Sequence, residues 1–185
     1  PAEVLAVEIR QFVGEGLQTL VPRVMGQTME AEQKKGKSAP AREWDEASFF
    51  AELESRKGHL AASVARKILA WAQPRMTRMS WGRGIQNGSF VPIVSHKDID
   101  YQLFAIYTYG SLEIYFEHYR NKPAFASPER REELLKRLNA IEGIRLPADC
   151  LERRPNIQLD ALGNEEALKG FLSTYEWFIE QVVKS

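Results

Sequence analysis

The fold is decided by residues 101–119, which read YQLFAIYTYGSLEIYFEHY. Two runs of aromatic and branched side chains flank a single break at Tyr109-Gly110, a pattern typical of a β-hairpin. A two-residue type I′ turn over Tyr109 and Gly110 would give the bulky tyrosine a positive φ, which is unfavourable. A type I turn over Thr108 and Tyr109, with Gly110 as a left-handed bulge, needs a positive φ at the glycine alone. The sequence therefore predicts the second turn.

This turn places Tyr107 opposite Ser111 and sorts the hairpin side chains onto two faces, because successive residues of a strand point to opposite sides. We expect the first face to lie on the core; its side chains are those of Phe104, Ile106, Leu112, Ile114 and Phe116. The second face carries Leu103, Ala105, Tyr107, Glu113, Tyr115 and Glu117. Because it is half polar and rich in tyrosine, this second face is expected to have a thin cover or to contact a partner.

Further strands are expected on both sides of this hairpin. Asn87-Gly88 is a strong two-residue turn signal, and it predicts strands at about residues 79–85 and 89–95. A short strand at residues 157–159 is expected at the sheet edge. The predicted fold is therefore α+β, an antiparallel meander of four to five strands covered by three helices.

Helical spacing of apolar residues and end signals define the covering helices. They are expected at residues 59–72, 128–141 and 164–183. Gly58 separates the first from a shorter helix capped by Asp45 or Ser48, and Ser127 caps the second. The outer side of the second helix is expected to carry Arg130, Arg131, Lys136 and Arg137.

The N-terminal part of the chain forms a separate unit in this interpretation. Residues 4–12 and 17–25 predict two strands, and a polar helix follows from Thr28. Residues 36–43 contain the best linker, so we expect an appendage at residues 1–35 and an α+β module at residues 44–185. Because the chain begins at Pro1 and enters a strand almost at once, we expect that an upstream part precedes it.

Composition limits the classes of function. The 185 residues are 44% hydrophobic and 27% charged, which indicates a soluble globular protein. The 25 lysines and arginines balance the 25 aspartates and glutamates, so any nucleic-acid binding must come from a local patch. No run of residues is long and apolar enough for a membrane span, so no membrane partner is expected. The single Cys150, expected to be a small buried residue, fits a reducing cytoplasm.

Glu8-Ile9-Arg10 on the first predicted strand has the spacing of one catalytic motif. An acidic residue and a basic residue two apart on a strand project to the same side. In nucleases of the PD-(D/E)XK class the carboxylate holds a divalent metal and a lysine orients water. A surface ion pair between Glu8 and Arg10 is the simpler interpretation.

Three blocks, AVEIRQFVGEGLQTLVPRVMGQT, WGRGIQNGSFVPI and YTYGSLEIYF, resemble uncharacterised bacterial proteins with a nuclease-like N-terminal part followed by a C-terminal α+β module. The resemblance implies that residues 1–35 are the end of a PD-(D/E)XK-like domain. Arg10 replaces the lysine and cannot act as a base, and the strand that brings the metal-binding aspartate is absent from this chain. Glu8 and Arg10 are therefore expected to be remnants, and Mg²⁺ or Mn²⁺ would bind only if an upstream aspartate existed.

A basic and aromatic surface is the second candidate site. Phosphates attract mobile cations, and unpaired bases stack on exposed aromatic rings. The expected nucleic-acid contacts are Arg75, Arg78, Trp81, Arg83, Arg120 and Lys122. The alternative is that Trp81 belongs to the core and the arginines are solvated.

Three functions remain open. The first, which rests partly on the resemblance, is a non-catalytic module of a bacterial DNA-processing or defence-type protein that contacts DNA. The second is a protein-interaction or self-association domain that uses Tyr107 and Tyr115 and forms a homo-oligomer. The third is a metal-dependent nuclease completed by upstream residues. Because no nucleophile elbow or metal-ligand spacing is present, no cofactor or metal site is expected in the module itself.

Overall fold

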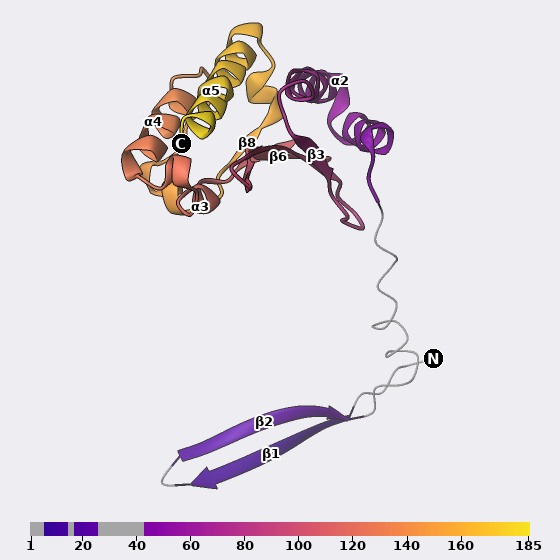
Figure 1. Ribbon diagram of the computed structural model, residues 1–185. Coiled ribbons are helices and arrows are strands. Elements are labelled where there is room, and N and C mark those ends of the chain that lie inside the picture. The colour runs from indigo at the N-terminus through magenta and orange to yellow at the C-terminus, as the bar shows by residue number, and fades with distance from the viewer. Residues whose placement is uncertain (1–5, 15–16, 26–42) are drawn as a thin grey trace. The chain divides into compact units, whose positions relative to one another are not determined.

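The structure is a computed structural model that describes residues 6–14, 17–25 and 43–185 (Figure 1). The chain divides into two compact units, residues 1–41 and 42–185. In the first unit, β1 (Ala6–Gly14) and β2 (Leu17–Met25) pair antiparallel. The helix expected after Thr28 and most of the expected linker lie outside the described residues.

The second unit contains a six-stranded antiparallel sheet, which confirms the α+β fold class. The strand order is β3-β4-β6-β7-β8, and β5 also pairs with β4. The strands are β3 (Arg78–Trp81), β4 (Ser89–His96), β5 (Ile99–Gln102), β6 (Phe104–Tyr107), β7 (Ser111–Ile114) and β8 (Asn156–Gln158).

The β6–β7 hairpin has the predicted turn and register. Gly110 has a φ of 78°, its N–H donates to the Tyr107 carbonyl at 2.9 Å, and Ile106 lies opposite Leu112. The apolar side chains assigned to the core face are all fully buried. Phe116 does not extend β7, however, because it begins the short helix α3 (Phe116–Tyr119).

The residues before this turn form two strands, β5 and β6, where the sequence predicts one. The sheet therefore contains more strands than expected. β5 continues from β4 through a two-residue turn at Lys97 and Asp98, whose φ values of 49° and 62° are both positive, as in a type I′ turn. Leu103 separates β5 from β6 and donates its N–H to the Pro92 carbonyl at 3.0 Å. Both β5 and β6 therefore pair with the long strand β4.

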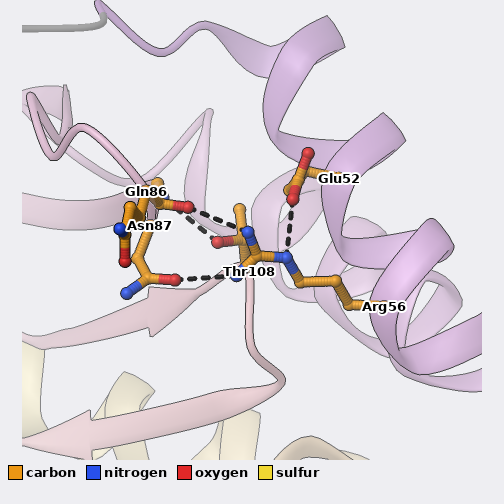
Figure 2. Close-up of polar contacts among 6 residues, drawn as sticks. Glu52, Arg56, Gln86, Asn87 and Thr108 are labelled. Atoms are coloured by element: carbon orange, nitrogen blue, oxygen red, sulfur yellow. Dashed lines mark hydrogen bonds and ion pairs between the residues drawn. The ribbon is translucent and has the colours of Figure 1, made fainter. Parts of the chain in front are cut away.

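The prediction of a two-residue turn at Asn87-Gly88 is wrong. Trp81 lies opposite Phe90, so residues 82–88 form a longer loop between β3 and β4. Arg56 is one reason, because its guanidinium donates to the Asn87 side chain at 2.7 Å and to the Gln86 carbonyl at 3.0 Å (Figure 2). Contacts with a helix, rather than local turn preference, set the conformation of this loop.

Trp44 holds the same loop from another direction. Its indole Nε1 donates to the Gly84 carbonyl at 2.6 Å. The Cα of Gly88 lies so close to the Trp44 ring that a Cβ there would come within 2.5 Å of it. The Gly88 N–H donates to the buried Thr108 hydroxyl at 3.1 Å, which joins the loop to the β6–β7 turn.

The helices begin at the predicted caps. α2 (Glu46–Ala72) is bent at Gly58, where φ is 77°, and begins at Asp45, which accepts a hydrogen bond from the Ser48 N–H at 2.8 Å. α4 (Pro128–Asn139) begins at Ser127, and α5 (Glu165–Val183) begins at Asn164. Short 3-10 helices lie at η1 (Pro123–Phe125), η2 (Ala148–Glu152) and η3 (Leu159–Leu162).

Figure 1 shows α2 and α5 on the same side of the sheet. Under α5 the core is aromatic, with the rings of Phe104 and Tyr175 4.8 Å apart between centroids and those of Phe125 and Phe178 stacked at 4.1 Å. Among the helices of the described residues, none has the length and apolar character required to cross a membrane.

The sequence places Arg131 on the outer side of α4, and this expectation is wrong. Its side chain is buried and donates to the carbonyls of Phe125 and Ala126, each at 2.7 Å. These carbonyls end η1 just before the helix, so a long cationic side chain folds back and satisfies them.

Candidate functional site: a tyrosine face beside a hollow

We use the name tyrosine face for the side chains of Tyr107, Tyr109, Glu113 and Tyr115. Tyr107 ends β6 and Glu113 lies on the adjacent strand β7, opposite Ala105. The Tyr107 hydroxyl donates to the Glu113 carboxylate, Oη to Oε2, at 2.8 Å. Strand pairing and one hydrogen bond therefore fix the centre of this face.

Two stacked ring pairs flank Glu113. The rings of Tyr107 and Tyr109 lie 5.0 Å apart between centroids at an interplanar angle of 15°, and Tyr109 is 39% exposed. The rings of Tyr115 and His118 lie 5.1 Å apart at 24°. Tyr115 is buried and Tyr107 is half-buried, so Tyr109 supplies the most exposed aromatic ring of the tyrosine face.

The tyrosines of this face remain neutral over the physiological range. Burial and the hydrogen bond to Glu113 raise the pKa of Tyr107 far above its usual value. Burial and the Glu113 charge likewise raise the pKa of Tyr109 and of Tyr115. These hydroxyls therefore do not act as general bases or nucleophiles near neutral pH.

Glu113 forms no ion pair within residues 43–185, whereas Glu117 and Glu152 each pair with an arginine. Glu117 lies 3.4 Å from Arg154, and Glu152 lies 2.6 Å from Arg120. Lys57 approaches the end of the tyrosine face, where its aliphatic stem lies over Gly110. Glu113 is half-buried, and a tyrosine hydroxyl is the donor that the structure shows for it.

The arginines expected to contact nucleic acid each lie beside a carboxylate. The pairs are Arg75–Glu176, Arg78–Asp100, Arg83–Glu43 and Arg120–Glu152. Arg75 also lies over the Trp71 ring. Trp81 is partly buried and contacts Phe49 and Phe90, with ring centroids at 5.8 and 5.6 Å. The neighbouring carboxylate partly neutralises the charge that each of these arginines would offer to a phosphate.

The structure brings only some of these basic residues together. Lys122 lines a hollow between β5 and α3 together with Asp100, and Arg78 pairs with Asp100 without lining the hollow itself. Trp81 and Arg83 line a different hollow, beside Glu43, Trp44 and Gly82.

Glu8 and Arg10 lie two residues apart on β1, opposite Arg23 and Val21. Their side chains lie outside the described part of the structure, so the nuclease hypothesis stays a prediction. Among the side chains of residues 43–185, no group of three or more histidines, cysteines, aspartates or glutamates has the arrangement of a metal site.

Sequence reasoning missed Tyr109 and His118 as members of an aromatic surface, and it missed the hollow beside β5. The sequence predicts only a turn role for Tyr109, although a bulged turn leaves its side chain outside the ladder. The signal for β5 was the polar pair Lys97-Asp98 between two strand-like runs, which has the length of a two-residue hairpin turn.

Comparisons of the chain with protein-family models, with curated proteins and with solved structures find no match. The function is therefore inferred from the tyrosine face and the hollow beside β5.

Proposed function

We propose that residues 42–185 form a protein-interaction module whose tyrosine face binds an arginine side chain of a partner protein. The observation that carries this proposal is Glu113, a half-buried carboxylate between two stacked aromatic pairs, which forms no ion pair among the described residues. The proposal therefore names an arginine side chain as the group that contacts these tyrosines.

Arginine fits this surface for two physical reasons. Its planar guanidinium donates two parallel hydrogen bonds to a carboxylate and stacks on aromatic rings at the same time. Cation–π contacts at partly exposed sites contribute about 0.5–1 kcal/mol. Tyr109 supplies an accessible ring beside Glu113, so a partner arginine would gain both contacts without moving the strands.

Nucleic-acid binding is the second candidate, and the observation in its favour is that Lys122 lines the same hollow as Asp100, the ion-pair partner of Arg78. The ion pairs of the other arginines and the balanced net charge argue against a strong phosphate-binding surface. The interaction module is therefore better supported. A nuclease activity would depend on residues outside the described unit.

The test uses the blocked tripeptides Gly-Arg-Gly and Gly-Gln-Gly as probes, titrated into the full chain while the tyrosine ring signals are followed by NMR. We expect saturable shifts of Tyr107 and Tyr109 with the arginine peptide and much smaller shifts with the glutamine peptide. Glu113→Gln should abolish the difference between the peptides. The matched control, Glu117→Gln, removes a carboxylate that already has an arginine and should preserve that difference.

Equal responses to both peptides, or an unchanged response in Glu113→Gln, would count against the arginine site. Two further measurements separate the alternatives. Salt-dependent binding of labelled DNA that is lost in an Arg78→Ala and Lys122→Ala double variant would favour nucleic acid. A concentration-dependent mass in light scattering that Tyr109→Ser abolishes would identify the partner as a second copy of the chain.

A further inference from the structure

A hollow of about 400 Å³ lies along one edge of β5. Its lining residues come from β5 on one wall and from α3 and the turn after it on the other. They are Asp100, Tyr101, Gln102, His118, Tyr119, Asn121 and Lys122. The hollow is separate from Glu113, which does not line it.

The hydrogen bonds of β4 show which backbone groups of β5 face the hollow. The Ser95 N–H donates to the Thr77 hydroxyl at 2.8 Å, and the Ile93 carbonyl accepts from the Thr77 N–H at 2.9 Å. The backbone groups of Ile93 and Ser95 therefore point away from β5. In an antiparallel ladder, a residue directly opposite such a residue also points its N–H and C=O outward.

Asp100 lies opposite Ser95, and Gln102 lies opposite Ile93. Their N–H and C=O groups therefore point toward the hollow. Within the part of the chain that the structure describes, no backbone or side-chain group bonds to these four polar atoms. They form an open strand edge with the spacing of a β-ladder.

This edge is open because the next strand ends too early to cover it. β7 stops at Ile114, and the chain turns into α3, where the Glu117 N–H donates to the Arg153 carbonyl at 3.1 Å. The buried Tyr119 hydroxyl donates to the Leu103 carbonyl, which fixes α3 across from the end of β5. The hollow between β5 and α3, called the slot below, therefore occupies the place where a neighbouring strand of the sheet would otherwise lie.

The charges of the slot indicate what would fill it. The Asp100 carboxylate already accepts from the Ser95 hydroxyl at 2.6 Å and pairs with Arg78. Lys122 forms no ion pair among residues 43–185, and its Nζ lies 5.9 Å from the centroid of the Tyr101 ring. The hydrogen bonds from Ser95 and Arg78 lower the pKa of Asp100, and the Lys122 charge is also one of the causes, so the Lys122 ammonium group lies near that carboxylate without pairing with it directly. A further carboxylate in the slot would meet an ammonium group that has no direct ion-pair partner among the described residues.

We propose that the edge of β5 binds an extended, acidic polypeptide segment of a partner protein by β-strand addition. The segment pairs with the outward N–H and C=O groups of Asp100 and Gln102, and an aspartate or glutamate of the segment pairs with Lys122. Main-chain hydrogen bonds supply the affinity in this mode, and side-chain contacts supply the selectivity. An open strand edge of this kind is otherwise a template for unwanted pairing. This site differs from the arginine site on the tyrosine face, although His118 lines the slot and stacks on Tyr115 of that face.

The test titrates three blocked pentapeptides into the full chain. The probes are Thr-Val-Asp-Val-Thr, the same peptide with asparagine in place of aspartate, and the aspartate peptide with N-methylated amides. We expect NMR shifts and slower hydrogen exchange at the amides of Asp100 and Gln102 with the first peptide. The asparagine peptide should bind about two- to fivefold more weakly, as for an exposed charge pair, and the N-methylated peptide should not bind.

Lys122→Gln should remove the preference for aspartate while leaving backbone pairing in place. Its matched control is Arg120→Gln, because Arg120 lies two residues away and already has a carboxylate at 2.6 Å. Gln102→Pro removes one outward N–H without touching the β4 ladder and should weaken both unmethylated peptides. If this variant fails to fold, the N-methylated peptide still tests the pairing on the unaltered protein.

Two results would overturn this proposal. One is equal binding of the methylated and unmethylated peptides, which would show that backbone pairing has no role. The other is slow exchange of the Asp100 and Gln102 amides in the free protein, which would show that the edge is already covered. Light scattering would then tell whether the cover is a second copy of the chain.

Discussion

Arg56 on α2 donates a hydrogen bond of 2.7 Å to the side chain of Asn87, which lies 31 residues further along the chain. The same guanidinium binds Glu52 one turn earlier on the helix, at 2.6 Å, and the carbonyl of Gln86 (Figure 2). One side chain thereby fixes the loop between β3 and β4 against the helix.

Replacing Arg56 by alanine should loosen this loop and lower the free energy of unfolding by about 1 kcal/mol, because the hydrogen bonds are partly exposed to water. Urea unfolding followed by circular dichroism measures the change. Arg153→Ala is the control, since it removes an exposed i,i+4 pair with Asp149 and should leave stability almost unchanged. Equal effects of the two variants would contradict the role of Arg56.

Gly88→Ala should destabilise the protein by about 1–3 kcal/mol, because its new Cβ would come within 2.5 Å of the Trp44 ring. Tryptophan fluorescence should shift as the Trp44 ring is displaced. Gly58→Ala provides the comparison: its Cβ meets nothing within 4 Å, but its φ of 77° makes any side chain strained. That variant should lose stability without a change in fluorescence; a shift in both would argue against a steric cause at Gly88.

Arg131→Met should cost about 2 kcal/mol, because the carbonyls of Phe125 and Ala126 lose their buried donor. Thermal unfolding at pH 7 measures the loss. Arg130→Met, on the exposed side of the same helix, should change stability far less. If both substitutions are neutral, the carbonyls have found another donor and the explanation fails.

Asp100 should make stability depend on pH in the acidic range. The hydrogen bond from Ser95, followed by that from Arg78, lowers the pKa of Asp100 below its usual value of 3.8. Its contribution to stability is therefore fully present above that usual value and is lost as the pH falls through the lower pKa of the folded state. Wild type should exceed Asp100→Asn in stability at pH 7, and the difference should shrink steadily below pH 4.

A second variant checks this assignment. Ser95→Ala removes the hydroxyl that donates to the Asp100 carboxylate at 2.6 Å. The stability difference between this variant and wild type should also shrink as the pH falls below 4, because the hydroxyl stabilises the ionised carboxylate. A difference that stays constant as the pH falls would mean that Asp100 is not the group that titrates.

Cys150 should be unreactive in the folded protein. Burial, followed by the charge of Asp149, raises the pKa of its thiol from 9.0 to about 11. This rise in the pKa lowers the thiolate fraction at pH 8 about a hundredfold. Labelling with Ellman's reagent should thus be slow until denaturant is added, and rapid labelling of the native protein would contradict this pKa.

Local sequence signals predicted the β6–β7 hairpin with its register, and they predicted the starts of three helices. These features depend on interactions within a few residues. Gly110 alone accepts a positive φ in the bulged turn, and Asp45, Ser127 and Asn164 provide cap oxygens for amides three residues away. No distant contact is needed to specify them.

The loop at residues 82–88 shows why other features could not be predicted. Asn87-Gly88 has the local preference of a hairpin turn, yet Trp44 and Arg56 compete for the same backbone through hydrogen bonds from distant positions. Arg131 is a similar case, because a charged helix residue looks exposed until nearby carbonyls require a donor.

By itself, the sequence determined the α+β class, the central hairpin and its inward side chains, because alternation, turn glycines and helix caps are local properties of the chain. The tertiary structure alone decided that β5 ends beside an uncovered slot and that Glu113 lies between two aromatic stacks without an ion pair among the described residues. Those relationships depend on which distant elements pack together, and packing is settled by the whole chain rather than by any one segment.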